Sequence, residues 1–373
     1  MKKKILFVAN VDWFFISHRL VIAEEAIVAG YEVFVAAEDT GRSNEIVNRG
    51  IGFIDLSFSR SGTNVFIELR TLSKFFRIYR DLKPDIVHHV TLKPVIYGSL
   101  IARVLKVRGV VNAVSGLGFN FTENRVSITK KIMLKLMKIG FNRIGVSVIF
   151  QNRDDFQELA NFSVISELNK VWLIKGSGVD LTNYFPTEFP DFSRVKILFP
   201  SRMLWDKGII ELLDASLILK SEYFNKIEIV LAGMLDDDNK AGITREFINS
   251  WSDGYYVNWI GYCKNMQDIY SDSHIVILPS YREGMPKALI EACAMGRAII
   301  TTDAIGCREC VDHGINGLRV PVKDAKALSL AIKELVDNKD EVVRMGKASR
   351  LKAISEFDIR FVIDAHLKIY RQY

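Results

Sequence analysis

Two glutamates on either side of a predicted helix start are the residues of this chain best suited to chemistry. Glu283 follows an apolar strand pattern, and Glu291 lies on the helical segment that comes next. Pro286 stands where the first helical position would fall. Proline suits that position, because it lacks an N–H and its φ is already helical. A helix that starts there presents backbone N–H groups, which bind anions. One anion site with two carboxylates suits a ligand that carries phosphate and hydroxyl groups, such as a sugar nucleotide.

A second group of residues supplies positive charge. Arg202 and Lys207 follow another strand pattern, where a nucleotide-binding turn belongs in a strand-helix fold. The planar fork of Arg202 and the mobile charge of Lys207 could together neutralise a diphosphate. The competing interpretation is a solvated basic loop, with Glu283 as a helix cap and Glu291 on a solvated face. Glu291 lies among apolar neighbours, however, where a carboxylate needs a partner.

The elements that must position these residues alternate along the chain. Short β-branched runs alternate with helical patterns, a Gly-, Ser- and Pro-containing break at 176–193 interrupts them, and the alternation then resumes up to a helical tail at 324–373. With 373 residues, two domains are the default. We expect an α/β fold of two doubly wound, Rossmann-like domains facing a central cleft. The predicted strands are 4–9, 32–37, 52–56, 85–89, 110–114, 147–150, 196–199, 227–231, 256–259, 274–278 and 298–301.

Composition and charge narrow the class of protein. A hydrophobic content of 49% and a charged content of 25% are ordinary for a globular protein. Residues 1–180 have a net charge of +8 and residues 181–373 a net charge of −2, which predicts an anionic partner for the first half. The apolar N-terminal run reads as a buried strand and not as a signal peptide. Four cysteines are too few for a disulfide framework, so we expect reduced thiols and a cytoplasmic location.

The two motifs together resemble the C-terminal half of the GT-B glycosyltransferases of family 4, which are retaining, metal-independent enzymes that use sugar nucleotides. The shared pattern is Ser-Arg-x-x-x-x-Lys-Gly followed, about 80 residues later, by Glu-Gly-x-Pro-x-x-x-x-Glu-Ala. This resemblance implies that Arg202 and Lys207 bind the donor diphosphate, that Glu291 binds the ribose, and that Glu283 binds a hydroxyl of the transferred sugar. It implies no cofactor and no metal. The expected donor-binding residues are Arg202, Lys207, Glu283, Gly284, Met285, Pro286, Lys287 and Glu291.

The first half departs from the commonest family pattern, which places two glycines after the first strand. Its loop 10–19 resembles a subgroup that builds bacterial surface glycans on a polyprenyl-diphosphate carrier. The resemblance implies a nucleotide-sugar donor, which we expect to be UDP-linked, and a polyprenyl-diphosphate-linked saccharide acceptor. It also implies a first domain of residues 1–180, a second of 181–356, and a last helix, 357–373, that returns to the first.

His18 is the residue of the first domain that we expect to join Glu283, Lys207 and Arg202 in catalysis, although a lone histidine is more often structural. A nucleic-acid partner is not expected. The candidate acceptor-binding residues are His18, Arg19, Lys93, Ser115 and Gly116.

A basic amphipathic helix is predicted over 128–139. Lys131, Lys135 and Lys138 fall on one face, and apolar side chains beginning with Ile132 fall on the other. Such a helix suits either an anionic membrane surface or an ordinary position on the protein core. Further basic residues on the segment 65–82 favour the membrane, and we expect a peripheral location on the inner face of the cytoplasmic membrane.

Two motifs, one acidic and one with a pair of cysteines, could suggest a metal site, but we predict no metal at either. The acidic run 236–238 has side chains that point different ways, so we expect a solvated loop. The pair Cys307 and Cys310 lacks the further ligands that zinc requires, and we interpret it as structural.

Two other functions remain open at this stage. A sugar-nucleotide epimerase or hydrolase on the same fold would act on the donor alone, which would leave the basic first domain unexplained. A non-catalytic sugar-binding protein with two domains would be expected to carry an export signal. Turnover of a sugar nucleotide, with and without an acceptor, discriminates among the three.

Overall fold

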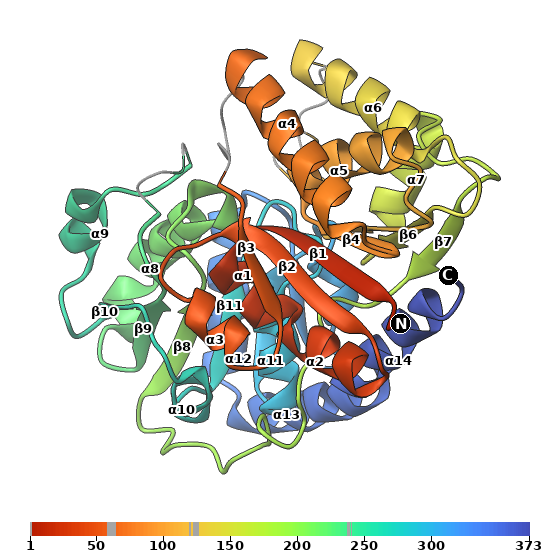
Figure 1. Cartoon of the computed structure of the whole chain (residues 1–373). Coiled ribbons are helices and arrows are strands. Elements are labelled where there is room, and N and C mark those ends of the chain that lie inside the picture. The colour runs from red at the N-terminus through yellow and green to blue at the C-terminus, as the bar shows by residue number, and fades with distance from the viewer. Residues whose placement is uncertain (1, 58–64, 119–120, 122–126, 237–238, 240) are drawn as a thin grey trace. The chain divides into compact units, whose positions relative to one another are not determined.

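The computed structural model describes residues 2–57, 65–118, 121, 127–236, 239 and 241–373 (Figure 1). The chain divides into two compact units, each with one parallel sheet. Unit 1 contains Met1–Ser177 and Arg360–Tyr373, and unit 2 contains Gly178–Ile359. The prediction of two doubly wound, Rossmann-like α/β domains is confirmed.

Unit 1 is built on a seven-stranded sheet in the order β3-β2-β1-β4-β5-β6-β7, and all its strand pairs are parallel. The strands are β1 (Lys4–Val11), β2 (Glu32–Glu38), β3 (Gly52–Asp55), β4 (Ile86–Val90), β5 (Gly109–Val114), β6 (Ser147–Phe150) and β7 (Lys170–Leu173). The helices are α1 (Asp12–His18), α2 (Leu20–Val28), α3 (Ser43–Val47), α4 (Val65–Leu82), α5 (Leu92–Val104), α6 (Ile128–Phe141), α7 (Arg153–Asn161) and α14 (Ile359–Tyr370).

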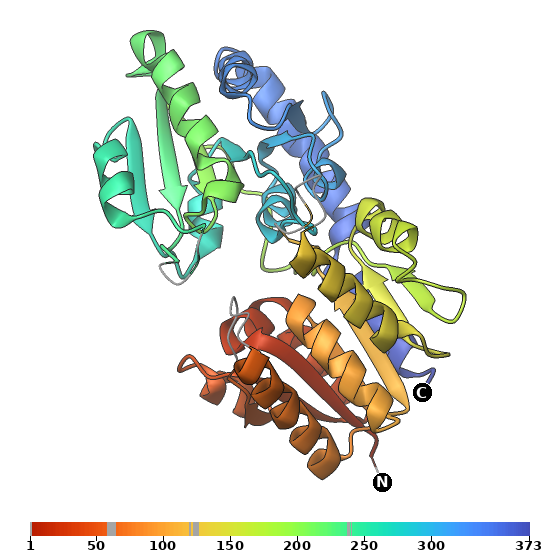
Figure 2. The same cartoon turned by 90° about the horizontal axis from the view of Figure 1, so that it is seen from above.

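The central strands of this sheet are buried on both faces, as expected of parallel strands between two layers of helices (Figures 1 and 2). Leu6 and Val8 belong to the apolar core that includes Phe75 of α4, and α5 packs on β1, β4 and β5. Phe7 points to the opposite face, where its ring meets Tyr370 of α14 at a centroid distance of 6.3 Å. The C-terminal helix therefore completes the core of unit 1.

Unit 2 is built on a six-stranded parallel sheet in the order β10-β9-β8-β11-β12-β13. In both sheets the strand order reverses beside the first strand, between β1 and β4 and between β8 and β11. Ligands of such sheets bind outside the carboxyl ends of the strands at this reversal. The strands are β8 (Val195–Pro200), β9 (Ile227–Ala232), β10 (Val257–Gly261), β11 (Ile275–Leu278), β12 (Ala298–Thr302) and β13 (Gly317–Val320). The helices are α8 (Ile209–Tyr223), α9 (Arg245–Trp251), α10 (Met266–Ser271), α11 (Lys287–Ala294), α12 (Ala325–Val336) and α13 (Lys339–Lys352).

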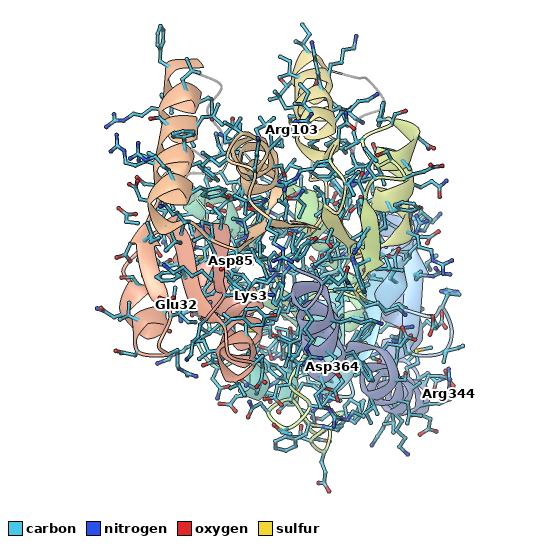
Figure 3. The ribbon with its side chains drawn as sticks, turned by 45° about the vertical axis from the view of Figure 1, so that its right-hand side comes forward. Lys3, Glu32, Asp85, Arg103, Arg344 and Asp364 are labelled. Atoms are coloured by element: carbon cyan, nitrogen blue, oxygen red, sulfur yellow. The ribbon has the colours of Figure 1, made fainter. Side chains whose placement is uncertain are left out.

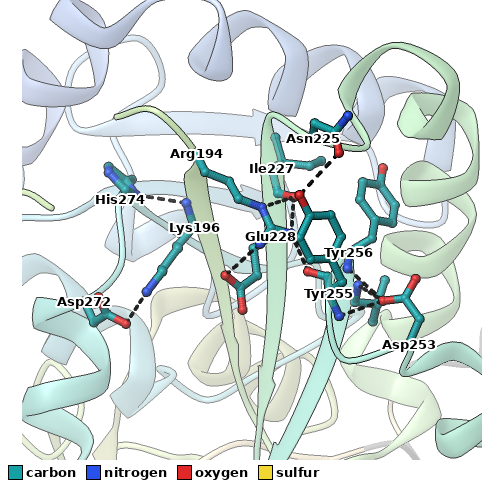
Figure 4. A network of polar contacts seen from close by, with 11 residues as sticks. Arg194, Lys196, Asn225, Ile227, Glu228, Asp253, Tyr255, Tyr256, Asp272 and His274 are labelled. Atoms are coloured by element: carbon teal, nitrogen blue, oxygen red, sulfur yellow. Dashed lines mark hydrogen bonds and ion pairs between the residues drawn. The ribbon is translucent and has the colours of Figure 1, made fainter. Parts of the chain in front are cut away.

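Polar contacts fix the opposite, amino-terminal edge of each sheet. In unit 1 the Glu32 N–H donates to the Lys3 carbonyl at 3.0 Å, close to Asp85 (Figure 3). In unit 2 the Lys196 N–H donates to Nδ1 of His274 at 2.9 Å, and the Lys196 ammonium pairs with Asp272 (Figure 4). These contacts set the strand register at the edge away from the expected ligands.

Some elements differ from the sequence-based expectations. The expected loop 10–19 contains helix α1, which begins at Asp12 directly after β1. The expected helical tail is interrupted, because α12 ends at Val336 and Asn338 then caps α13 by accepting a hydrogen bond from the Glu341 N–H. A π-helical turn then separates α13 from α14. The short strands β7 and β13 were not predicted.

Three buried histidines lie within unit 1. His89 donates from Nδ1 to the Asn112 side-chain oxygen and accepts at Nε2 from the Tyr79 hydroxyl, and burial lowers its pKa to about 4. His366 of α14 stacks on His88 at 5.4 Å. Burial lowers the pKa of His366 to about 3, and burial with the nearby His366 lowers that of His88 well below its ordinary value.

Acid should destabilise unit 1 through these groups. Each histidine binds a proton more weakly in the folded than in the unfolded chain, so stability is lost as the pH falls through about 6.5. For His89 alone, the loss in the free energy of unfolding approaches about 3 kcal/mol near pH 4. Hydrogen exchange of the β4 amides across this pH range measures the loss. In the variant His89→Gln, whose amide can keep both hydrogen bonds, the dependence should be shallower, and an equally steep dependence would contradict the assignment.

Candidate functional site

An ion pair joins the loops that follow β8 and β11, at the point where the strand order of unit 2 reverses. Nζ of Lys207 lies 2.5 Å from Oε1 of Glu283, and the two side chains are only 14% and 15% exposed. The Ser280 hydroxyl donates to the same oxygen at 2.9 Å. Burial alone would lower the pKa of Lys207, but the carboxylates of Glu283 and Asp206 outweigh it and raise that pKa. Lys207 therefore stays charged.

The same two loops are held together through their backbones. Gly208 follows Lys207 with φ +73°, and a Cβ atom there would lie 2.1 Å from the Pro279 carbonyl oxygen. The Tyr281 N–H donates to the Asp206 carbonyl at 3.0 Å. On the other side of Glu283, a Cβ atom on Gly306 would lie 2.4 Å from the Glu283 carbonyl oxygen. Glycine is required at positions 208 and 306, because any side chain there would push the loops apart.

Glu291 lies on α11 with most of its carboxylate already bound. It is 7% exposed, accepts from the Tyr270 hydroxyl at 3.1 Å, and lies 3.4 Å from Nζ of Lys287. Burial, together with the Glu291 carboxylate, raises the pKa of Tyr184. The expected position of Pro286 was off by one residue, because Pro286 is the N-cap and α11 begins at Lys287. Gly284 and Met285 precede this helix start in the chain.

Arg202 forms a second ion pair in the loop after β8. Its Nη1 lies 2.5 Å from Oδ2 of Asp236, and the side chains are 39% and 15% exposed. The Met203 N–H donates to the Met234 carbonyl at 3.0 Å, which fixes the two chain segments beside each other. The expectation of a solvated acidic loop was wrong for Asp236, and the other two residues of that run, 237 and 238, lie outside the described part of the chain.

The candidate residues of unit 1 lie after neighbouring strands of its sheet. His18 ends α1, stacks on Phe14 at 4.2 Å, and shares a short hydrogen bond of 2.6 Å between its Nδ1 and the Ser17 hydroxyl. Arg19 is only 3% exposed and donates to the His18 carbonyl at 2.8 Å, while burial lowers its pKa to about 10. Arg19 thus supports the backbone at His18 from within the core.

Lys93, Ser115 and Gly116 occupy the same edge of the unit 1 sheet. Nζ of Lys93 lies 2.8 Å from Oε1 of Glu68, whose other oxygen accepts from the Tyr97 hydroxyl at 2.6 Å. Ser115 and Gly116 directly follow β5, and Gly116 has φ +114°. The structure therefore brings the candidates of each unit to the carboxyl edge of that unit's sheet.

The partners of these residues were not identified from sequence. Asp236, Tyr270 and Glu68 contact candidate residues, and packing between elements brings each of them there. Ser280 differs, because it lies three residues before Glu283 in the same loop. Within the described ranges, no group of three or more His, Cys, Asp or Glu side chains could hold a metal ion. The described helices also include none that is long and apolar enough to cross a membrane.

Comparison with known protein families decides the class of the chain. Residues 194–338 match the family described as glycosyl transferases group 1, and residues 4–152 match the glycosyl transferase 4-like family. The chain is a glycosyltransferase of family 4. The expected family and enzyme class are confirmed, and the site lies within the matched part of unit 2.

Two bacterial proteins illustrate the relatives of this glycosyltransferase. One is the N,N'-diacetylbacillosaminyl-diphospho-undecaprenol alpha-1,3-N-acetylgalactosaminyltransferase of Campylobacter jejuni, which is 26% identical over 91% of this chain and 90% of its own. The other is the UDP-Gal:alpha-D-GlcNAc-diphosphoundecaprenol alpha-1,3-galactosyltransferase of Escherichia coli, which is 23% identical over 81% of this chain and 79% of its own.

A solved structure gives the same fold. Anabaena Alr3699/HepE in complex with UDP aligns with a TM-score of 0.76 and 16% sequence identity, over 100% of both chains. The glycosyltransferase therefore has the GT-B fold, as the sequence motifs predicted.

The backbone approach at Gly208 gives a stability prediction with a matched control. Gly208→Ala should lower the free energy of unfolding of unit 2 by about 3 kcal/mol, because positive φ and the clash with the Pro279 carbonyl both oppose a Cβ atom. Gly254→Ala, with φ +72° and nothing within 4 Å, should cost only about 1 kcal/mol. Urea unfolding of both variants checks the difference, and equal losses would contradict the required approach of the two loops.

Proposed function

We propose that this glycosyltransferase transfers a sugar, with retention of its anomeric configuration, from a UDP-linked donor to a saccharide carried on polyprenyl diphosphate. The acceptor would be an intermediate of a bacterial surface polysaccharide. The observation that carries the proposal is the grouping of Arg202, Lys207 and Glu283 beside the start of α11, at the strand reversal of unit 2.

The donor half of the proposal follows from this chemistry. Negative charge develops on the diphosphate in the transition state, as its bond to the sugar breaks. Arg202, Lys207 and the N–H groups at the start of α11 would neutralise this charge. The carboxylate of Glu283 has further lone pairs that would accept a hydrogen bond from a hydroxyl of the sugar. Glu291 would accept hydrogen bonds from the ribose hydroxyls. Positive protein groups supply this stabilisation, so we propose that no metal ion is needed.

The acceptor half rests on unit 1 and on the relatives. Both bacterial relatives are named for undecaprenol-diphosphate-linked acceptors, and HepE was crystallised with UDP. His18 is the proposed catalytic group of this unit, held by Ser17 and supported by buried Arg19. Lys93, Ser115 and Gly116 would contact the acceptor, with Glu68 orienting the Lys93 ammonium.

A transfer assay tests the proposal. UDP-, GDP- and TDP-linked sugars are offered with polyprenyl-diphosphate-linked saccharides, with and without EDTA, and the product is analysed by NMR. We expect transfer from a UDP-sugar, the same anomeric configuration in donor and product, and no effect of EDTA. Epimer or free sugar formed from the donor alone would instead favour an epimerase or hydrolase, and the absence of any turnover would favour a sugar-binding protein.

Variants connect this activity to the site. Lys207→Ala and Glu283→Ala should each lower kcat by at least ~100-fold, because Lys207 would stabilise the charge that develops on the diphosphate and Glu283 would position the transferred sugar. Lys196→Ala serves as the control, since this lysine also pairs with a carboxylate, Asp272, but at the opposite end of β8 (Figure 4). Near-normal activity of both site variants would refute the site.

We also propose that helix α6 places unit 1 on the inner face of the cytoplasmic membrane. Leu134 and Met137 are buried against the core, but Ile132 is 54% exposed and lies among the exposed residues Lys131 and Lys135. The outward face therefore combines apolar and basic side chains, and not basic ones alone as predicted. That combination suits an anionic lipid surface. Exposed Ile67 and Leu69 of α4 add apolar surface on the same unit.

Charge reversal tests this membrane contact. Changing Lys131, Lys135 and Lys138 to Glu should abolish most binding to vesicles that contain anionic phospholipid, at ~1 kcal/mol per charge near the surface. Co-sedimentation with vesicles measures the binding. The control reverses three exposed lysines of unit 2, namely Lys264, Lys326 and Lys347. Equal binding by both triple variants would show that α6 is not the contact.

A further inference from the structure

Each of the three basic side chains among the expected donor-binding residues already has a carboxylate partner. Arg202 pairs with Asp236 at 2.5 Å and Lys207 with Glu283 at 2.5 Å. The third pair, Lys287 with Glu291, is longer at 3.4 Å. Three cations thus face three carboxylates, and this set of residues is electrically neutral without ligand. A diphosphate that binds here brings at least two further negative charges. At least one ion pair must then open, or its carboxylate must stay close to the phosphate and be repelled by it.

The three pairs differ in how readily they open. Glu291 accepts from Tyr270 as well, so it keeps a partner when Lys287 turns to a phosphate. Lys207 and Glu283 are the least exposed of the three pairs, and the Ser280 hydroxyl also donates to Glu283. Both side chains have proposed roles in binding the donor. Asp236 has no proposed role at the donor, and its other described side-chain contact is a weak one of 3.4 Å with Asn239.

Asp236 is held in place by the backbone around it. The Met203 N–H donates to the Met234 carbonyl at 3.0 Å, and the Trp205 N–H donates to the Ala241 carbonyl at 2.9 Å. These bonds fix the chain on both sides of Asp236 against the loop after β8. Arg202 is the more exposed partner, so it is the side chain free to turn toward a phosphate while the Asp236 carboxylate stays behind.

We propose that Asp236 is an internal competitor of the donor diphosphate for Arg202, and that it weakens the binding of the nucleotide so that the product can leave. This inference rests on the proposed donor role of Arg202. The carboxylate and the diphosphate are alternative partners of one guanidinium, so the free energy of the Arg202–Asp236 pair is subtracted from that of nucleotide binding. Asp236 is a positioning residue that acts through Arg202.

Calorimetric titration with UDP, GDP and inorganic pyrophosphate tests the competition. Asp236→Asn should bind UDP and pyrophosphate about five-fold more tightly, the gain expected from removing a competing pair at the protein surface. GDP should show the same ratio if it binds, because the competition concerns the diphosphate and not the base. Asp236→Ser is the second variant if Asn disturbs the fold, and urea unfolding checks both.

Two further variants make the result specific. Asp272→Asn removes the carboxylate of the Lys196 pair at the other end of β8, and it should leave the affinity for UDP unchanged (Figure 4). Arg202→Gln should weaken UDP binding, and adding Asp236→Asn to it should produce no gain. In the transfer assay, Asp236→Asn should lower the inhibition constant of UDP by about the same five-fold factor, a shift that a merely structural role would not produce.

The outcomes separate this inference from the proposed function. Unchanged or weaker binding of UDP to Asp236→Asn, while Arg202→Gln and Lys207→Ala weaken it, would overturn the competition and leave the donor site standing. Normal UDP binding by Arg202→Gln and Lys207→Ala would overturn the donor site itself, and the competition with it. A gain from Asp236→Asn that persists in the Arg202→Gln background would show that Asp236 opposes the nucleotide directly and not through Arg202.

Discussion

Unit 2 depends on a buried ion pair that spans the strand reversal of its sheet. Lys207 and Glu283 come from loops that are far apart in sequence, and each would be costly to bury alone. Their pairing permits both loops to lie at the edge of β8 and β11 with little access to water. The close backbone approaches at Gly208 and Gly306 then fix where the two charges meet. Charged groups held in this way need little reorganisation when a ligand arrives.

Local sequence rules predicted much of the fold. Strands such as β8 and β11 are short, mostly apolar runs whose residues are nearly all buried, so their composition predicted them. Helix α1 was mistaken for a loop, because its aromatic residues do not follow a helical period and it begins without a gap after β1. The short strands β7 and β13 carry little signal of their own and are defined by pairing with a neighbour.

The candidate site was predictable in its residues and not in its contacts. Arg202 and Lys207 stand after one strand and Glu283 after another, and the rule that ligands bind at the carboxyl edge was enough to bring them together. Their partners could not be read in this way. Asp236 reaches Arg202 only because the loops after β8 and β9 pair through their backbones, and Tyr270 reaches Glu291 from α10, which the motif does not include. Such contacts arise from packing between elements.

The membership of α14 in unit 1 has a consequence for how the chain is made. Its side chains Tyr370 and His366 fill the face of the sheet around Phe7 and His88, and the Tyr373 hydroxyl shares a hydrogen bond of 2.8 Å with Ser147. Unit 2 is one continuous stretch of sequence, whereas unit 1 needs residues from both sides of it. A ribosome therefore delivers all of unit 2 before it delivers the last helix of unit 1. The unit that is begun first is the last to be completed.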